Sequence, residues 1–433
     1  MRLRIEIFIL AVTLIYMVTT PAAAELVAGA GRASITPDLR ELPTPLGGYG
    51  ARGGAPASGV HDDVHARALV LRSGDSKPVA LVSLELCFAT ERLEQEILAR
   101  LPEGMFDEAT LFLSATHSHT SPDPMCMNVR NPVRLRQVGI YDQRLVDFTA
   151  QRTADAIMQA FDSLAPAQLT VAQRQVDLNM NRRREEQTDQ EMIVLELRRP
   201  DSPRAIAVVV NYAAHPTIYS AAMMQISGDW PGEVSRRVEA AMGGESVCIV
   251  VNGALGDAAP KGSYVDPPAK RVEQYGGAVA EVVQSMRQAA EMIDRPIAVR
   301  AWSQPVNAPP RTLPQAAVQT WGLPKPLLEY LLNQLMPPVV TMSYLELGPV
   351  TFIGFPGEPS TPIGLEAKGI AREKGVTIPA IAAPVGDWVG YILTPQQYSA
   401  GGYEASASFY GLSLAEALLE QIRADENLGQ KSH

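Results

Sequence analysis

The feature that most constrains this chain is a pair of histidines at the end of a predicted strand. Residues 111–115 form an apolar run, and His117 and His119 follow it directly. Side chains two positions apart in an extended segment point the same way, so both imidazoles can face one point. The chain has only 6 histidines, which makes this spacing notable. Two interpretations fit the pair: a metal centre that needs further ligands from elsewhere, or a polar turn with one buried histidine.

The composition is that of a globular protein. Hydrophobic residues make up 46% and charged residues 19% of the 433 positions, which is enough apolar material for a large core. The net charge is −10, and no long basic run occurs. We therefore do not expect nucleic acid or an anionic membrane surface to be the main partner.

Residues 1–24 have the pattern of an export signal. Arg2 and Arg4 precede an apolar stretch over residues 5–18, and three alanines at residues 22–24 fit a cleavage site. We expect a mature chain of residues 25–433 that is secreted or periplasmic, with an uncleaved membrane anchor as the alternative. No later stretch is long and apolar enough to span a bilayer, so no transmembrane segment is expected after cleavage.

Strand and helix patterns alternate along the rest of the chain. Residues 142–164 repeat apolar side chains at steps of three or four, as one face of a helix does. Residues 205–212 are almost all apolar, which is typical of a central strand. Because we find no linker, repeat or abrupt change of composition, we predict one large α/β domain. Its mixed β-sheets are flanked by helices, and its metal site lies at the strand ends.

Two segments have no clear place in this pattern. The glycine-rich residues 47–54 lack the spacing of a phosphate-binding fingerprint, so they form either a loop over a site or a mobile turn. Residues 309–338 are interrupted by prolines around one short predicted helix, residues 327–335. This second segment is a candidate lid or insertion.

The chain has 3 cysteines and no Cys-x-x-Cys pair, so a zinc site made of thiolates is not expected. Cys87 and Cys248 lie in apolar runs and are predicted to be buried free thiols. Cys126 follows the histidine pair in a loop, where it lines a site, pairs with another cysteine or has no role.

Further possible metal ligands follow other apolar strand patterns, namely His215, Glu358 and Tyr391. Each has an ordinary explanation by itself. His215 precedes a proline that ends a strand, Glu358 could stabilise a helix N-terminus, and Tyr391 could line a wall. Taken together with His117, they offer the nitrogen and oxygen ligands that zinc accepts, and they leave room for water.

Short sequence motifs are spread along residues 27–410, in an order that is shared by one protein family. They are residues 31–36, 48–49, 59–61, 66–68, 115–120, 181–182, 211–215, 226–229, 256–260, 356–361, 390–392 and 403–406. In this order they resemble the N-terminal catalytic domain of the neutral, non-lysosomal ceramidases.

The resemblance implies four zinc ligands, which are His117, His215, Glu358 and Tyr391. It also implies a zinc-activated water that attacks an amide carbonyl. His119 would lie beside the metal and handle protons. Arg182 would orient a polar substrate head. Asp229 would be a site carboxylate, although a helix cap explains that residue almost as well.

The chain departs from the family at the turn that contains Gly256 and Asp257. Family members carry a serine, regarded as catalytic or substrate-positioning, where this chain has Ala259. A serine nucleophile at this turn is therefore excluded, whereas attack by a metal-activated water needs no such hydroxyl. Selectivity for substrates that this serine would hydrogen-bond is expected to weaken. The family's C-terminal immunoglobulin-like domain is also expected to be absent, which weakens the case for action on lipid at an interface.

Three hypotheses follow. The first is an exported zinc amidohydrolase whose substrate is a small-molecule or lipid N-acyl amide, with ceramide-like lipids as the first guess. The second keeps the zinc chemistry and changes the bond to an ester, a small amide or a cell-wall amide. The third is a zinc-retaining binding protein without turnover, in which Ala259 marks the loss of catalysis.

Overall fold

The computed structural model describes residues 25–131, 134–183, 186–202, 204–262, 266–314, 317–318 and 322–430. The predicted export signal, residues 1–24, lies outside the described residues.

The chain builds one motif three times: three antiparallel strands, a helix, a strand parallel to the third, and a second helix. The first unit consists of β1 (Leu26–Ser34), β3 (His65–Ser73), β4 (Val79–Leu84), α1 (Glu91–Leu98), β5 (Leu111–Ala115) and α2 (Gln143–Asp162). The second consists of β7 (Gln168–Gln175), β9 (Glu191–Arg198), β10 (Ala205–Tyr212), α3 (Asp229–Ala241), β12 (Val247–Asn252) and α4 (Pro268–Gln288). The third consists of β15 (Val299–Asn307), β16 (Val339–Leu347), β17 (Val350–Gly354), α7 (Thr361–Glu373), β19 (Ile378–Ala382) and α10 (Leu414–Ala424).

Shorter elements complete the structure. They are β2 (Gly59–Val60), β6 (Ala165–Pro166), β8 (Asn179–Asn181), β11 (Gln225–Ile226), β13 (Ala258–Pro260), β14 (Glu291–Met292), α6 (Lys325–Leu335), β18 (Glu358–Pro359), β20 (Tyr391–Ile392), α8 (Pro395–Ala400), α9 (Tyr403–Ser406) and the 3-10 turns Gly50–Arg52, Pro124–Met127 and Arg136–Val138. The helix expected at residues 327–335 is confirmed as α6, which lies in the connection from β15 to its partner strand β16.

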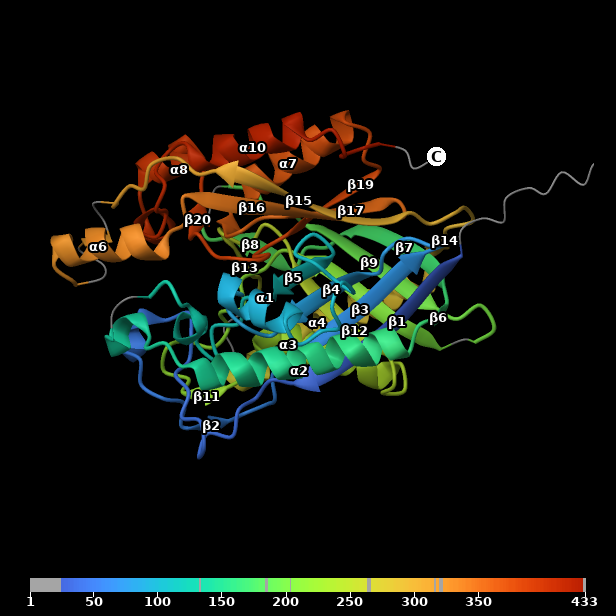
Figure 1. Cartoon of the computed structure of the whole chain (residues 1–433), viewed down its shortest axis with the longest axis horizontal. Coiled ribbons are helices and arrows are strands. Elements are labelled where there is room, and N and C mark those ends of the chain that lie inside the picture. The colour runs from blue at the N-terminus through green and yellow to red at the C-terminus, as the bar shows by residue number, and fades with distance from the viewer. Residues whose placement is uncertain are drawn as a thin grey trace, which may run out of the picture.

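The three sheets share one apolar core, and a pair of helices covers the outer face of each. Alternation along the strands produces this division. In β3, Leu69 and Leu71 point into the shared core, whereas Val70 packs with α1 and α2. In β10, Val209 points inward and Val210 packs with α3 and α4. Figure 1 shows α7 and α10 along one side of the molecule, α2 along the opposite side, and strands between them.

The predicted fold class is confirmed, since mixed sheets flanked by helices make up the chain. The threefold repetition of the motif is a finding that the sequence did not reveal. Strands buried on both faces need only apolar residues, so the three units share a hydrophobic pattern without sharing residue identities.

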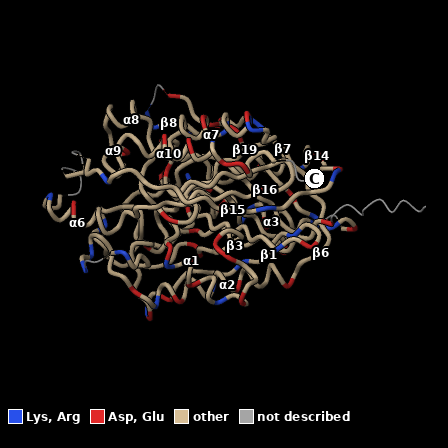
Figure 2. Tube along the Cα trace, turned by 45° about the horizontal axis from the view of Figure 1, so that its top comes forward, with Lys and Arg blue, Asp and Glu red and all other residues tan. Residues whose placement is uncertain are grey.

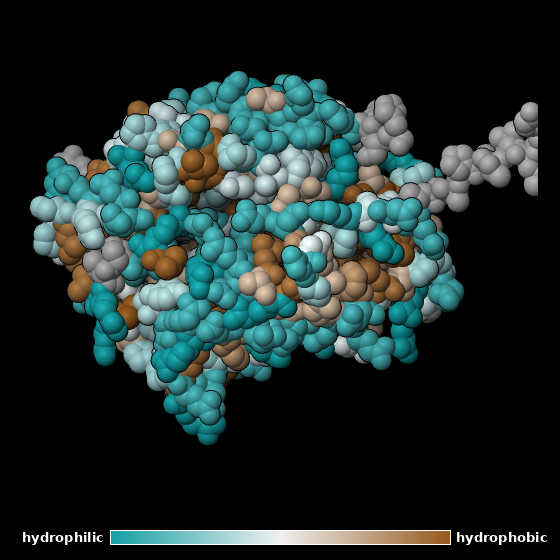
Figure 3. Space-filling view, viewed as in Figure 1, coloured by the Kyte–Doolittle hydropathy of each residue, from teal (hydrophilic) through white to brown (hydrophobic). Residues whose placement is uncertain are grey.

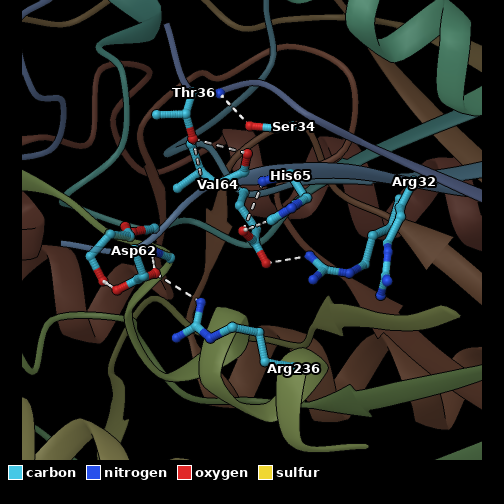
Figure 4. Close-up of polar contacts among 12 residues, drawn as sticks. Arg32, Ser34, Thr36, Asp62, Val64, His65 and Arg236 are labelled. Carbon is cyan, nitrogen blue, oxygen red and sulfur yellow. Dashed lines mark hydrogen bonds and ion pairs between the residues drawn. The ribbon is translucent and has the colours of Figure 1, made fainter. Parts of the chain in front are cut away.

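A buried ion network joins the first unit to the second. The Arg67 guanidinium of β3 donates to Glu239 of α3 at 2.8 Å and also to Glu85, just beyond β4. The His65 amide donates to the Glu85 carboxylate at 2.8 Å. Burial opposes ionisation of Glu85, but the Arg67 charge prevails and lowers the pKa of Glu85 to about 2. Figure 4 shows this region, where Arg236 of α3 reaches Asp62.

Charges of both signs are mixed over the surface. Figure 2 shows acidic and basic residues interspersed along the outer elements. The face drawn in Figure 3 is mostly hydrophilic, with separate hydrophobic patches. Within the described ranges, no helix combines the length and the apolar character that crossing a membrane requires.

We predict that Arg67→Ala strongly destabilises the protein. Removal of the guanidinium takes the closest counter-ion from Glu85 and one of two arginine partners from Glu239, a change that costs about 3–5 kcal/mol. Urea unfolding measures this loss. Arg423→Ala is the control, because Arg423 forms its ion pairs on the exposed face of α10 and should leave the unfolding midpoint almost unchanged. Equal losses in the two variants would contradict the assigned role of Arg67.

Candidate metal centre

The structure brings the four predicted metal ligands together. His117 lies two residues beyond β5, and His215 lies three residues beyond β10. Glu358 and Tyr391 begin β18 and β20, which pair in parallel so that these two residues are direct partners. The exposed fractions are 1% for His117, 0% for His215, 2% for Glu358 and 3% for Tyr391. The four ligands therefore share one buried site.

Three electron-pair donors converge in this site. The distance from Glu358 Oε2 is 3.4 Å to His117 Nε2 and 3.8 Å to His215 Nε2. One ligand atom from each of these residues lies within 4.8 Å of the other two. The aromatic ring of Tyr391 is nearly parallel to that of His215, with 6.4 Å between ring centroids.

Backbone and side-chain hydrogen bonds orient these donors. His117 Nδ1 lies 2.5 Å from the Cys87 carbonyl oxygen, and His215 Nδ1 lies 3.1 Å from that of Leu255. Each Nδ1 therefore carries the proton and donates it to the carbonyl, which leaves a lone pair on Nε2. Trp388 donates its indole N–H to the other carboxylate oxygen of Glu358 at 2.8 Å.

The donor set fits a divalent cation. Within the described chain, no group donates a hydrogen bond of normal geometry to His117 Nε2 or Glu358 Oε2. Buried lone pairs that face one another are costly unless a proton or a cation lies between them. Two imidazoles and one carboxylate, with a tyrosine beside them, match the ligand types of zinc sites that keep an open position.

Burial and neighbouring charges set the protonation of the histidines. Burial lowers the pKa of His119 and His215 well below the ordinary value, and nearby positive groups, including Arg182, lower it further. Burial also acts to lower the pKa of His117, but Cys87 and Glu358 raise it well above that value. A proton and a metal cation therefore compete for the lone pair on His117 Nε2.

The backbone at His117 is strained. Its φ is 71°, in the left-handed region that residues other than glycine seldom adopt. Such strain collects at functional sites, where the surrounding structure holds it in place. In this conformation the His117 imidazole reaches the Glu358 carboxylate.

His119 lies beside the ligands and beneath the glycine-rich loop. Its Nε2 is 3.2 Å from His215 Nε2, and its ring meets the Tyr49 ring edge-on at 4.7 Å. A Cβ on Gly48 would approach the His119 ring to 2.4 Å, so only glycine fits there. Arg52 donates to the His119 carbonyl at 2.5 Å. Of the two interpretations of residues 47–54, the structure favours a loop over the site.

The turn around Asp257 fixes the other parts of the site. The Asp257 carboxylate accepts hydrogen bonds from the backbone and hydroxyl of Thr361, both at 2.7 Å, and from Gln397 at 3.0 Å. The amide of Gly256 donates to the Pro359 carbonyl at 3.0 Å. Through these hydrogen bonds, Asp257 and Gly256 position the segment that carries Glu358.

Ala259 lies on β13, and Arg182 directly follows β8, which pairs with β13. Ala259 is partly exposed and faces Met180 across this pair. The Arg182 amide donates to the Asp257 carbonyl at 2.7 Å, and its guanidinium donates to Thr217 at 3.2 Å. The effect of Arg182 on the histidine pKa values agrees with a position near them.

Asp229 is the first residue of α3, directly after the N-cap Gly228. It is fully buried and accepts hydrogen bonds from the backbone amides of Tyr219, at 3.2 Å, and Trp230, at 2.6 Å. Its φ of 52° is also left-handed. Burial raises the pKa of Asp229 to about 7, although these hydrogen bonds oppose the rise. The structure does not support the capping explanation, because Gly228 is the N-cap of α3 and this helix has no side-chain cap. A role of Asp229 toward substrate stays a prediction.

Several residues of the site were missed by sequence reasoning. Trp388 orients Glu358, while Tyr49 and Arg52 pack on His119. Cys87 is buried as expected, but its Sγ also lies 3.8 Å from His117 Nδ1. The available signal was position: Cys87 and Trp388 both follow apolar strands, as the predicted ligands do.

Trp388→Phe tests the orientation of Glu358. The variant keeps an aromatic ring but removes the N–H that donates to the carboxylate, so we expect metal affinity to fall about 10–100-fold. Competition with a fluorescent chelator measures this affinity. Trp302→Phe is the matched control, because Trp302 donates the same kind of bond to Asp425, which is not among the ligands. Equal affinities in both variants would argue against the role of Trp388.

Asp229→Asn tests the buried carboxyl. The folded pKa of about 7 exceeds the unfolded value of about 3.9. The folded state therefore holds this proton more tightly, and stability falls as pH rises between these values. Asparagine tolerates the left-handed backbone and does not titrate.

We expect the Asp229→Asn variant to gain stability relative to the parent chain as pH rises from about 4 to about 7. Urea unfolding in chelator at several pH values measures the difference. A difference that stays constant across this window would show that Asp229 titrates normally.

Comparisons with known proteins agree with the geometry. Residues 26–285 match the family model "Neutral/alkaline non-lysosomal ceramidase, N-terminal". "Neutral ceramidase 1" of Arabidopsis thaliana is 24% identical over 201 residues, which are 42% of this chain and 25% of that relative.

Two solved structures share the fold. A crystal structure of neutral ceramidase from Pseudomonas aeruginosa has a TM-score of 0.79 at 19% identity, and a structure described as "Ceramidase complexed with C2" has 0.80 at 18%. Both matches cover 92% of this chain and 74% of the other. The resemblance seen in the sequence motifs is confirmed, and the chain belongs to the neutral/alkaline non-lysosomal ceramidase family.

Proposed function

We propose that this protein is an exported zinc-dependent hydrolase that cleaves the amide bond of N-acyl lipids, with ceramide-like molecules as substrates. The observation that carries the proposal is the convergence of His117 Nε2, His215 Nε2 and Glu358 Oε2 in a buried site. Family membership supports hydrolysis of such an amide, since the matched relative and the solved structures are described as ceramidases.

His117, His215, Glu358 and Tyr391 would hold the zinc. When bound there, zinc supplies a Lewis acid that polarises a carbonyl oxygen and makes a water molecule a nucleophile at neutral pH. Burial and then the negative charge of Glu358 raise the pKa of Tyr391 well above its ordinary value, so the hydroxyl keeps its proton until a cation is near.

Other residues of the chain would bind the substrate and move protons. His119 Nε2 borders the ligand His215, and burial keeps its imidazole neutral, so it can accept a proton from the attacking water and pass it to the leaving amine. Arg182 supplies a fixed positive charge beside the histidines, where it would orient a polar head group. The loop over His119 limits access of bulk water.

Ala259 bears on which substrate is used. Without a hydroxyl at this partly exposed position, residue 259 offers no side-chain hydrogen bond to a head group. The same observation favours a second candidate, a protein that retains zinc and binds amide lipids without turnover. Hydrolysis of an ester or of another amide would keep the metal chemistry and change only the bond.

Export rests on residues 1–24 alone. Their basic start, apolar stretch and alanines support a secreted or periplasmic protein. Cys87, Cys126 and Cys248 are buried free thiols. They therefore do not distinguish an oxidising from a reducing compartment.

Metal analysis combined with a substrate panel tests the proposal. Protein purified without chelator should contain zinc and hydrolyse a ceramide-like amide, and chelation should remove both zinc and activity until zinc is restored. His117→Ala and His215→Ala should each abolish both, because each removes one buried nitrogen ligand. Arg423→Ala, on the exposed face of α10, should retain both.

The panel also separates the alternatives. Faster hydrolysis of an ester or a cell-wall amide would change the assigned bond. Binding of zinc and of the amide lipid without any turnover would favour the second candidate, a zinc-retaining binding protein, over an enzyme. Absence of zinc would remove the proposed chemistry altogether.

A further inference from the structure

Cys87 occupies the position in the first unit that metal ligands occupy in the other two. His215 lies three residues beyond β10, and Glu358 lies four residues beyond β17. These are the third strands of the second and third units. The third strand of the first unit is β4, and Cys87 lies three residues beyond its end at Leu84. The repeated motif therefore directs a thiol toward the same region as the imidazole and the carboxylate.

The Cys87 thiol lies near two histidines. Its Sγ lies 3.8 Å from His117 Nδ1. The thiol, one nitrogen of His117 and one of His119 all lie within 4.8 Å of one another. In a tetrahedral zinc site, a thiolate and an imidazole nitrogen are separated by about 3.6 Å. The observed separation is thus close to that of two ligands on one ion.

The unpartnered nitrogen of His119 adds a second observation. Among the described residues, His119 Nδ1 has no hydrogen-bond partner, and the side chain is only 6% exposed. Its other nitrogen faces His215. Cys87 is 3% exposed. One nitrogen of the buried His119 imidazole therefore has no partner among the described residues.

We propose that Cys87, His117 and His119 form a second site, which takes a thiophilic cation such as Cd²⁺. On binding, the thiol releases its proton to solvent and the sulfur becomes a thiolate ligand. The ion bonds to Nδ1 of His117, and the Nδ1 proton moves to Nε2 through solvent. The Cys87 carbonyl then loses its hydrogen bond from this ring.

The two sites are antagonistic because they share His117. A neutral imidazole has one lone pair, on either Nδ1 or Nε2. A cation on Nδ1 therefore removes the lone pair that His117 offers to the first site, facing Glu358. A thiophilic cation at Cys87 releases the metal of the first site, and the protein becomes sensitive to such ions.

Cadmium titration of the purified full-length protein tests this site. Two quantities are measured: the ultraviolet absorption that a cadmium–thiolate bond produces, and the zinc and cadmium that stay with the protein after desalting. The variants are Cys87→Ala and the control Cys248→Ala, which also removes a buried thiol but one placed beside Glu239 and Arg67. Circular dichroism checks that both variants fold.

We expect the parent chain and Cys248→Ala to develop the thiolate absorption and to lose zinc as cadmium binds. Cys87→Ala should develop no absorption and should need about tenfold more cadmium before it loses zinc. The zinc measurement rests on the proposed function. The thiolate absorption does not, so it tests cadmium binding at Cys87 even in protein that contains no zinc. Absence of the absorption from the parent chain, or its persistence in Cys87→Ala, would overturn the proposal.

Discussion

Two imidazole nitrogens and one carboxylate oxygen lie buried together, and no described residue donates a hydrogen bond of normal geometry to His117 Nε2 or Glu358 Oε2. This arrangement is unfavourable unless a positive charge occupies the space. Carbonyl oxygens of Cys87 and Leu255 fix which nitrogen of each histidine points inward, and Trp388 fixes the carboxylate. The site is thus preorganised for a cation before any ligand arrives, and the proposed hydrolysis depends on that preorganisation.

The fold supplies the convergence. Three units of the same design pack their sheets around one core, so chain segments that leave the strands meet at a common point. The turn around Asp257 ties the start of α7 to the second unit, and Arg67 ties the first unit to α3. Both links are buried and charged, which makes the relative placement of the units specific.

Much of the site could be predicted from the sequence because its ligands come directly after apolar strands. His117, His215, Glu358 and Tyr391 are recognisable by that position, and the resemblance to a known family indicated that they form one ligand set. The strands themselves were predictable because strands buried on both faces are written as continuous apolar runs.

Other features depend on contacts between distant residues, and local patterns do not encode them. The threefold repetition is invisible because each unit fills the shared core with different apolar side chains. Trp388 acts through one hydrogen bond to a partner 30 residues away, and Asp257 acts through hydrogen bonds to partners 104 and 140 residues away. The loop around Gly48 could not be assigned, since its function lies in the close approach to the His119 ring, a tertiary contact.

Zinc-edge X-ray absorption on the purified protein tests the central claim most directly, because it reports the atoms bound to the metal. The account predicts one zinc ion per chain with two imidazole ligands and oxygen ligands in the remaining positions, and loss of the imidazole signal in a His117→Ala, His215→Ala double variant. Zinc that keeps its imidazole ligands in the double variant, or a sulfur ligand in untreated protein, would contradict it.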